Sequence, residues 1–165
     1  MLGRIIKLAV VAGAGYAAWK KYSGKGQGGD FFRQALAAGA AEVEAARSAQ
    51  LRGASAELRR LAQHMAHAHG EINKRLSEAA GTEVPVPDQR QRDALHAIEV
   101  EQGEAYDQAW LRHEAQAHAR SIRLFKHEIS RNGPGAGVAA EILPELQAHA
   151  DEIAALREAP RATAA

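Results

Sequence analysis

The sequence predicts an all-α protein, a four-helix bundle with a short crossover helix, preceded by a hydrophobic N-terminal helix. Alanine, the residue with the highest helix propensity, is abundant, and aromatic residues make up only 5% of the 165 residues. β-branched and aromatic residues are therefore too sparse for a sheet. Apolar residues also recur every three or four positions in four long segments, as amphipathic helices require. The chain length favours one compact domain, which we place at residues 30–158.

The first predicted element is a hydrophobic helix, residues 1–22, that attaches the chain to a membrane. Its uncharged run covers residues 8–19 and has basic residues on both sides, which can reach the two surfaces of a bilayer. The run is shorter than the roughly 20 residues of a usual spanning helix, so an interfacial helix or a cleavable signal helix is the alternative. We expect a retained anchor. Small residues at every fourth position would allow this helix to form a homo-oligomer with a second copy: Ala9, Gly13 and Ala17.

A glycine-rich linker, residues 23–29, is predicted to separate the anchor from the bundle. Asp30 is the predicted N-cap of the first bundle helix, which continues to about Arg52. Ser55 is the predicted N-cap of the second. That helix should end at Gly81, because glycine readily adopts the left-handed conformation that follows many helices.

The connection that follows is predicted to be a crossover, residues 82–102. Its first part contains two prolines, each of which disfavours helix at the preceding residue, so we expect it to be extended. Asp88 is the predicted N-cap of a short helix that ends near Glu99. One long connection among otherwise short loops is typical of a four-helix bundle with a crossover.

Two further helices complete the predicted bundle. The third covers about residues 103–131, and the fourth covers about residues 138–158 after a glycine-rich turn. Pro144 falls in the first two turns of the fourth helix and is expected to kink it. The tail, residues 159–165, is expected to be disordered.

Composition excludes several classes of site. The formal net charge is +1 and no basic stripe is interleaved with aromatic residues, so no nucleic-acid partner is expected. The absence of cysteine excludes disulfides, thiolate metal sites and a cysteine nucleophile. No serine is placed next to a predicted core histidine, and the glycine-rich linker lacks the flanking residues of a phosphate loop. We therefore predict no catalytic residues.

The helical phase divides the eight histidines into two groups. At 100° per residue, His69, His118 and His149 fall within or beside the apolar stripes of their helices. On the first bundle helix, Glu42 occupies the corresponding position. The other five histidines are expected to be solvated: His64, His67, His96, His113 and His127.

These four polar residues each fall near the midpoint of a helix, so we expect Glu42, His69, His118 and His149 to converge in one layer. Imidazoles and a carboxylate suit a transition metal such as iron, zinc, copper or manganese. Glu114, one turn before His118, is either a further ligand or a hydrogen-bond acceptor for an imidazole. The alternative is a metal-free layer in which the same groups hydrogen-bond to one another.

Four segments of the sequence together form a recognisable pattern. They are FFRQALAAGAAEVEAA, LAQHMAHAHGEIN, YDQAWLRHEAQAHARSIRLF and ILPELQAHADEIAAL. With a proline break between the second and third, this pattern resembles the DUF4142 family, a bacterial family of unknown function. The resemblance covers about residues 31–156 and implies a ferritin-like four-helix bundle. It maps Glu42, His69, His118 and His149 onto the recurring polar core positions of the family.

The resemblance also sets the functional expectation. Members are often described as membrane or outer-membrane proteins, so we expect a membrane-anchored bundle that faces the periplasm and serves metal binding, sensing or stress protection. The alternatives are a metal-free envelope interaction or structural bundle and, third, a metal-dependent oxidase. The family usually has Asp directly before each of the two mid-helix histidines, whereas Ala68 and Ala117 stand there in this chain. If those acids support a metal site, this chain lacks that support.

Overall fold

The computed structural model describes residues 28–159, which contain five α-helices and no strand. The helices are α2 (Gly28–Arg52), α3 (Ala56–Ala80), α4 (Gln89–Glu99), α5 (Gly103–Ser130) and α6 (Ala136–Glu158). The all-α prediction is confirmed. The predicted membrane anchor and most of the predicted linker lie outside the described residues. Within residues 28–159, no helix combines the length and the apolar character needed to cross a bilayer.

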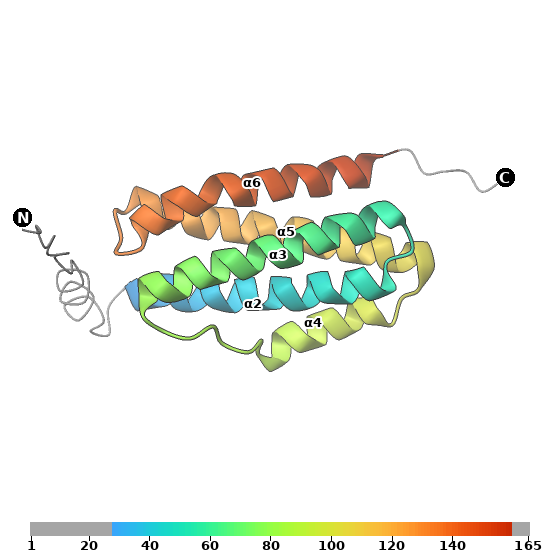
Figure 1. The fold of residues 1–165 in the computed structure, drawn as a ribbon, viewed down its shortest axis with the longest axis horizontal. Coiled ribbons are helices and arrows are strands. Elements are labelled where there is room, and N and C mark those ends of the chain that lie inside the picture. Colours follow the sequence, from blue (N-terminus) through green and yellow to red (C-terminus); the bar gives the residue numbers. More distant parts are fainter. Residues whose placement is uncertain (1–27, 160–165) are drawn as a thin grey trace, which may run out of the picture.

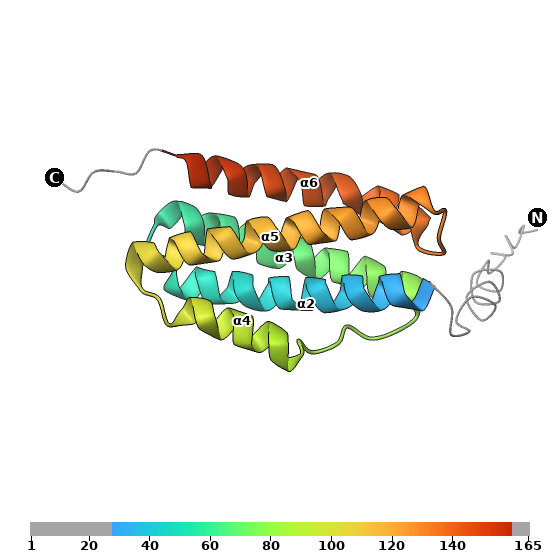
Figure 2. The same ribbon diagram turned by 180° about the vertical axis from the view of Figure 1, so that it is seen from behind.

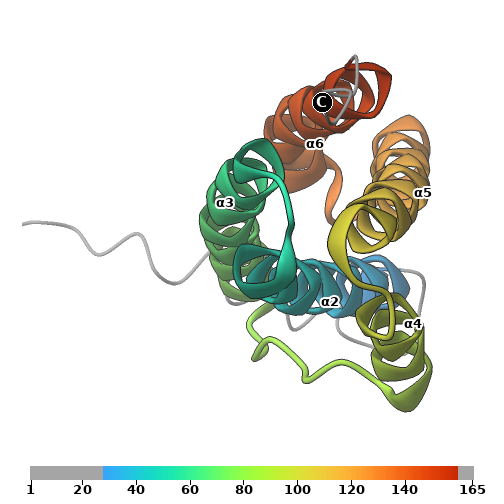
Figure 3. The ribbon, with the colours of Figure 1, turned by 90° about the vertical axis from the view of Figure 1, so that its right-hand side faces the viewer.

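Helices α2, α3, α5 and α6 form the bundle (Figures 1 and 2). Viewed along its axis, they occupy four corners in the order α2, α3, α6, α5, and α4 lies outside against α2 and α5 (Figure 3). Helices α2 and α6 run in one direction and α3 and α5 in the other (Figure 1). The connection from α3 to α5 must therefore return along the bundle, and α4 forms part of that crossover.

Two helices begin two residues earlier than the sequence predicted. Helix α2 begins at Gly28, so Asp30 lies in its first turn, where it pairs with Arg33, and is not the N-cap. A carboxylate in the first turn also interacts favourably with the helix dipole, so sequence alone does not separate these two positions. Helix α6 begins at Ala136 and continues through Pro144.

The predicted caps of α3 and α4 are confirmed. The Ser55 hydroxyl accepts a hydrogen bond from the Leu58 N–H at 3.2 Å. At the end of α3, Gly81 has φ 62°, in the left-handed region that glycine adopts at low cost. Asp88 caps α4 in a reciprocal capping box with Gln91. These caps define both ends of the extended stretch that leads into α4.

Two buried acids of α5 hold the loops at opposite ends of the bundle. The Asp107 carboxylate accepts hydrogen bonds from the backbone N–H groups of Ala54 and Ser55, at 2.7 and 2.9 Å, and from the Ser55 hydroxyl at 2.8 Å. Glu128 accepts a hydrogen bond from the backbone N–H of Gly135 at 2.8 Å, in the turn before α6. Neither role was predicted from the sequence.

A layer of polar side chains divides the core into two apolar halves. One half is built around Leu58, Leu61, Met65, Tyr106, Trp110 and Ile153. The other half is built around Phe31, Leu36, Ile72, Leu76, Phe125 and Ile142. On each of the four bundle helices, the buried residues of the two halves flank at least one buried polar residue. This layer is the candidate functional site.

Candidate metal centre

All five predicted site residues lie in the polar layer. Glu42 comes from α2, His69 from α3, Glu114 and His118 from α5, and His149 from α6. None is more than 5% exposed. The four bundle helices therefore each contribute at least one of them.

His69, His118 and His149 form the first group within the layer. Their ring centroids are 5.1 to 5.7 Å apart, and one nitrogen of each ring lies within 4.8 Å of the other two. The Nε2 atoms of His69 and His118 are 3.2 Å apart. Two nitrogen ligands of a tetrahedral zinc ion at about 2.0–2.1 Å are separated by about 3.3 Å. The spacing of this pair therefore fits two ligands of one ion.

The orientation of His118 is set by its own helix. Its Nδ1 lies 3.0 Å from the backbone carbonyl oxygen of Glu114. Because a carbonyl oxygen only accepts, Nδ1 carries a proton and donates it, so Nε2 is the nitrogen that holds the lone pair in the neutral ring. That lone pair faces His69. Metal-binding histidines commonly donate their second N–H to a carbonyl or carboxylate in this way.

Burial keeps the imidazoles of His69 and His149 neutral, the form in which a ring nitrogen binds a metal. Desolvation lowers the pKa of His69 to about 4, although the charge of Glu42 opposes the change. Desolvation also lowers the pKa of His149 to about 4, and the nearby His118 adds to the shift. Both rings are thus neutral near pH 7, so no proton has to be released before a nitrogen binds a metal. The Nδ1 of His149 is buried and has no hydrogen-bond partner among the described residues.

Glu42, Glu114 and His118 form the second group. The Nδ1 of His118 lies 3.8 Å from Oε2 of Glu42 and 3.7 Å from Oε2 of Glu114. If both carboxyls were ionised, their buried oxygens would find no donor in the described chain. A proton on one of them removes this difficulty, because the two carboxyls can then hydrogen-bond to each other.

The opposite pKa shifts of the two glutamates favour Glu114 as the holder of the shared proton. Burial and the charge of Glu42 raise the pKa of Glu114 well above its usual range. Burial also acts to raise the pKa of Glu42, but the hydrogen bond from Glu114 and the nearby imidazoles of His118 and His69 outweigh it and lower that pKa. The layer thus holds one carboxylate, Glu42, and one neutral carboxylic acid, Glu114.

The two groups share His118 but lie on opposite sides of its ring. His69 meets the Nε2 side, whereas the two glutamates lie on the Nδ1 side. The sequence predicted one point of convergence, and the structure shows two adjoining groups. This arrangement favours the three imidazoles as the ligand set, with the Glu42 carboxylate as a nearby negative charge on the Nδ1 side of His118.

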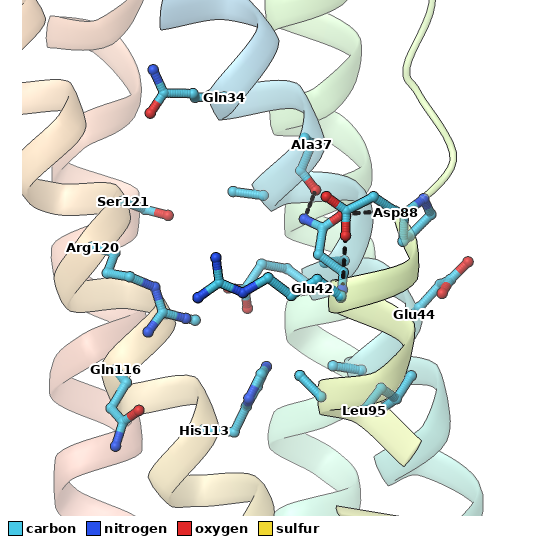
Figure 4. A pocket seen from close by; sticks show the side chains of 18 of the residues that line it. Gln34, Ala37, Glu42, Glu44, Asp88, Leu95, His113, Gln116, Arg120 and Ser121 are labelled. Carbon is cyan, nitrogen blue, oxygen red and sulfur yellow. Dashed lines mark hydrogen bonds between the residues drawn. The ribbon is translucent and has the colours of Figure 1, made fainter. Parts of the chain in front are cut away.

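A cleft of about 690 Å³ between α2, α4 and α5 reaches this layer (Figure 4). Glu42 lines it, and His113 and Arg120 extend into it from α5. His113 is half-buried, and desolvation lowers its pKa, so the prediction that it is solvated was wrong. The crossover helix covers this side of α5, which the phase of a single helix cannot reveal. The other four histidines predicted to be solvated are exposed: His64, His67, His96 and His127.

Comparison with known proteins gave one match. The model of a family described as "Domain of unknown function (DUF4142)" matches residues 16–156. No curated protein and no solved structure matches the chain. The matched range contains every residue of the two groups.

Proposed function

Since the chain belongs to the DUF4142 family, which has no assigned function, we propose a function from the site itself: the bundle binds one transition-metal ion through His69, His118 and His149. The observation that carries this proposal is the meeting of three buried imidazoles from three helices, with one nitrogen of each within 4.8 Å of the others. Imidazole suits iron, zinc and copper, and a nearby carboxylate extends the range to manganese. The single-crossover topology supports a ferritin-like classification.

Each residue has a distinct task in this proposal. His118 presents the lone pair of Nε2, because its Nδ1–H is committed to the Glu114 carbonyl. The negative charge of Glu42 stabilises positive charge at the centre, and the proton on Glu114 keeps the two carboxyls from repelling each other. A bound ion would supply a Lewis acid or a redox centre, which suits a role in metal binding, sensing or stress protection.

A metal-free structural layer is the alternative, and one contact favours it. At 3.2 Å, the Nε2–H of His69 can donate to the Nε2 lone pair of His118 without any ion. Together with the Glu42–Glu114 hydrogen bond, this contact satisfies much of the buried polar layer. A bundle of this kind would serve as an envelope interaction or structural module.

Elemental analysis separates these two functions. The full chain, purified without chelator, should contain close to one equivalent of iron, zinc, copper or manganese. His118→Ala and His149→Ala should lose it, because each removes one ligand. His67→Ala, a change at an exposed histidine of α3, should retain it. If the unsubstituted protein contains none of the four metals, the metal-free function is correct.

We also propose that residues 1–22 attach the bundle to a membrane with the bundle in the periplasm. The support for the attachment is the basic-flanked apolar run of the sequence, which lies outside the described residues, and the periplasmic side rests on the family resemblance alone. The full chain should sediment with membranes and be released by detergent but not by high salt. External protease should cleave the bundle only after the outer membrane is opened. Release by salt alone would contradict an inserted anchor.

A further inference from the structure

A fourth histidine connects the buried imidazoles to the surface. The ring of His64, on α3, lies 5.5 Å from that of His149, on α6, at an angle of 86°. Its Nδ1 is 3.3 Å from Oε2 of Glu152, also on α6. The side chains of His64 and Glu152 are 53% and 45% exposed, whereas His149 is 3% exposed. An unbroken series of imidazoles therefore extends from solvent to His69 and His118.

This series lies at the contact between α3 and α6, which are neighbours in the bundle (Figure 3). These two helices pack less closely than α2 with α3 or α5 with α6. The Nδ1 of His149, buried behind His64, has no hydrogen-bond partner in residues 28–159. An ion that binds at the surface pair would therefore meet an imidazole with a free nitrogen next.

The charged residues at the contact between α3 and α6 differ from those that line the cleft between α2, α4 and α5. Glu152 and Glu145 both favour a positive charge at His149, and Glu145 is paired with Arg75. Glu152 forms no ion pair with an arginine or lysine in the described part of the chain and so keeps its attraction for a cation. The cleft on the opposite side is lined by as many acids as arginines, so it has no net attraction for a cation: Glu42, Glu44 and Asp88 with Arg33, Arg90 and Arg120. That cleft also leads to the glutamates and not to the three imidazoles.

We propose that His64 and Glu152 form a loading site that binds a divalent transition-metal ion at the surface and passes it to His149. Imidazole and carboxylate together bind such ions, and neighbouring nitrogens allow the ligands to be exchanged one at a time. The inference rests on the proposed function, because it requires an inner three-histidine site that receives the ion. It adds a route for the ion and two residues, His64 and Glu152, that increase the rate of loading but do not bind the ion at the inner site.

Stopped-flow mixing of the metal-free full chain with Co²⁺ tests this proposal, because tetrahedral Co²⁺ absorbs visible light and reports arrival at the inner site. His64→Ala and Glu152→Gln should each lower the second-order loading rate about tenfold or more, as loss of a local attractive site predicts. The final spectrum and the 1:1 stoichiometry should stay unchanged. His67→Ala, at an exposed position one turn along α3, is the matched control and should load at the original rate.

Three results would count against the proposal, and each has a different meaning. Equal loading rates in His64→Ala, Glu152→Gln and the control exclude a loading role. A changed spectrum or stoichiometry in His64→Ala makes His64 a resident ligand and overturns the proposal. No absorbance from the unsubstituted protein with Co²⁺ refutes the inner site, and so the proposed function itself. Far-UV circular dichroism of each variant verifies that the bundle is intact.

Discussion

Buried imidazoles make the stability of this bundle depend on pH in a definite direction. The pKa of His69 is lowered by burial to about 4, from about 6.5 for a free imidazole. Between these values the unfolded chain binds a proton that the folded protein does not, so stability rises with pH. The contribution is fully present above about pH 6.5 and is lost as the pH falls toward 4. For His69 alone it amounts to about 3 kcal/mol, at about 1.4 kcal/mol per pKa unit.

Urea denaturation of the metal-free protein between pH 7 and pH 4.5 measures this linkage. The free energy of unfolding should fall toward pH 4.5, and His69→Gln should flatten the fall, because glutamine does not titrate. His67→Gln should keep the original slope, since that side chain is exposed. An equal slope in all three proteins would show that His69 binds a proton as readily in the folded state as in the unfolded one.

The two glutamates differ in charge, and substitution can reveal which carries it. Glu114→Gln should change metal affinity little at pH 7, because the amide replaces a carboxyl that is already neutral and can still donate to Glu42. Glu42→Gln removes the only carboxylate of the layer and should weaken binding about 10- to 100-fold. Competitive titration against a chelator of known affinity measures both. Equal losses in the two variants would assign a charge to Glu114 as well.

At the scale of helices, the approach of α2 to α3 depends on one glycine. A Cβ at Gly39 would lie 1.9 Å from Oδ1 of Asn73, a buried side chain of α3. Gly39→Ala should therefore destabilise the bundle by about 1–3 kcal/mol through overpacking. Gly70→Ala is the matched control, because an added Cβ there meets nothing within 4 Å, and it should stabilise α3 by up to about 1 kcal/mol.

Denaturant midpoints of these variants test the close approach. Adding Asn73→Ala to Gly39→Ala should recover part of the loss, because the smaller side chain leaves room for the new methyl group. Two substitutions in contact couple, so the double variant should be more stable than the sum of the single effects predicts. Strict additivity would mean that the two residues do not limit the spacing of the helices.

The loop between α2 and α3 depends on an acid of a third helix. Asp107→Ala removes the acceptor of three hydrogen bonds from Ala54 and Ser55, and should cost about 2–3 kcal/mol. Asp93→Ala is the control, because Asp93 is exposed on α4 and accepts a side-chain hydrogen bond from Gln89 of its own helix. Thermal unfolding compares the two. A shift in Tm no larger than that of the control would show that the loop holds without Asp107.

The sequence predicted the helices well because their signals are local. Caps such as Ser55 and Asp88 act within one turn, and the helical phase alone placed His118 and His149 in the core. What it missed depends on contacts between helices. Asp107 lies on the buried face of α5, yet its partners belong to a distant loop. The division of the polar layer into two groups depends on side-chain rotamers, which residue spacing does not specify.

For the molecule as a whole, the long connection predicted a crossover but not the face that the crossover covers. Helix α4 packs against α2 and α5, and its side chains Ala94 and Leu95 line the cleft beside His113. Burial of that histidine is thus a property of the tertiary arrangement. The same packing leaves the side of α3 and α6 uncovered, so that His64 remains exposed.

The division of the core by the polar layer bears on how the four helices are aligned along the bundle axis. Surfaces rich in alanine are nearly featureless, and such helices could slide past one another with little change in apolar contact. A slip of one turn, about 5.4 Å, would press a histidine or glutamate against the leucine and methionine of a neighbouring half. Burying such a group without a partner costs several kcal/mol. The layer therefore selects a single axial register, whether or not an ion occupies it.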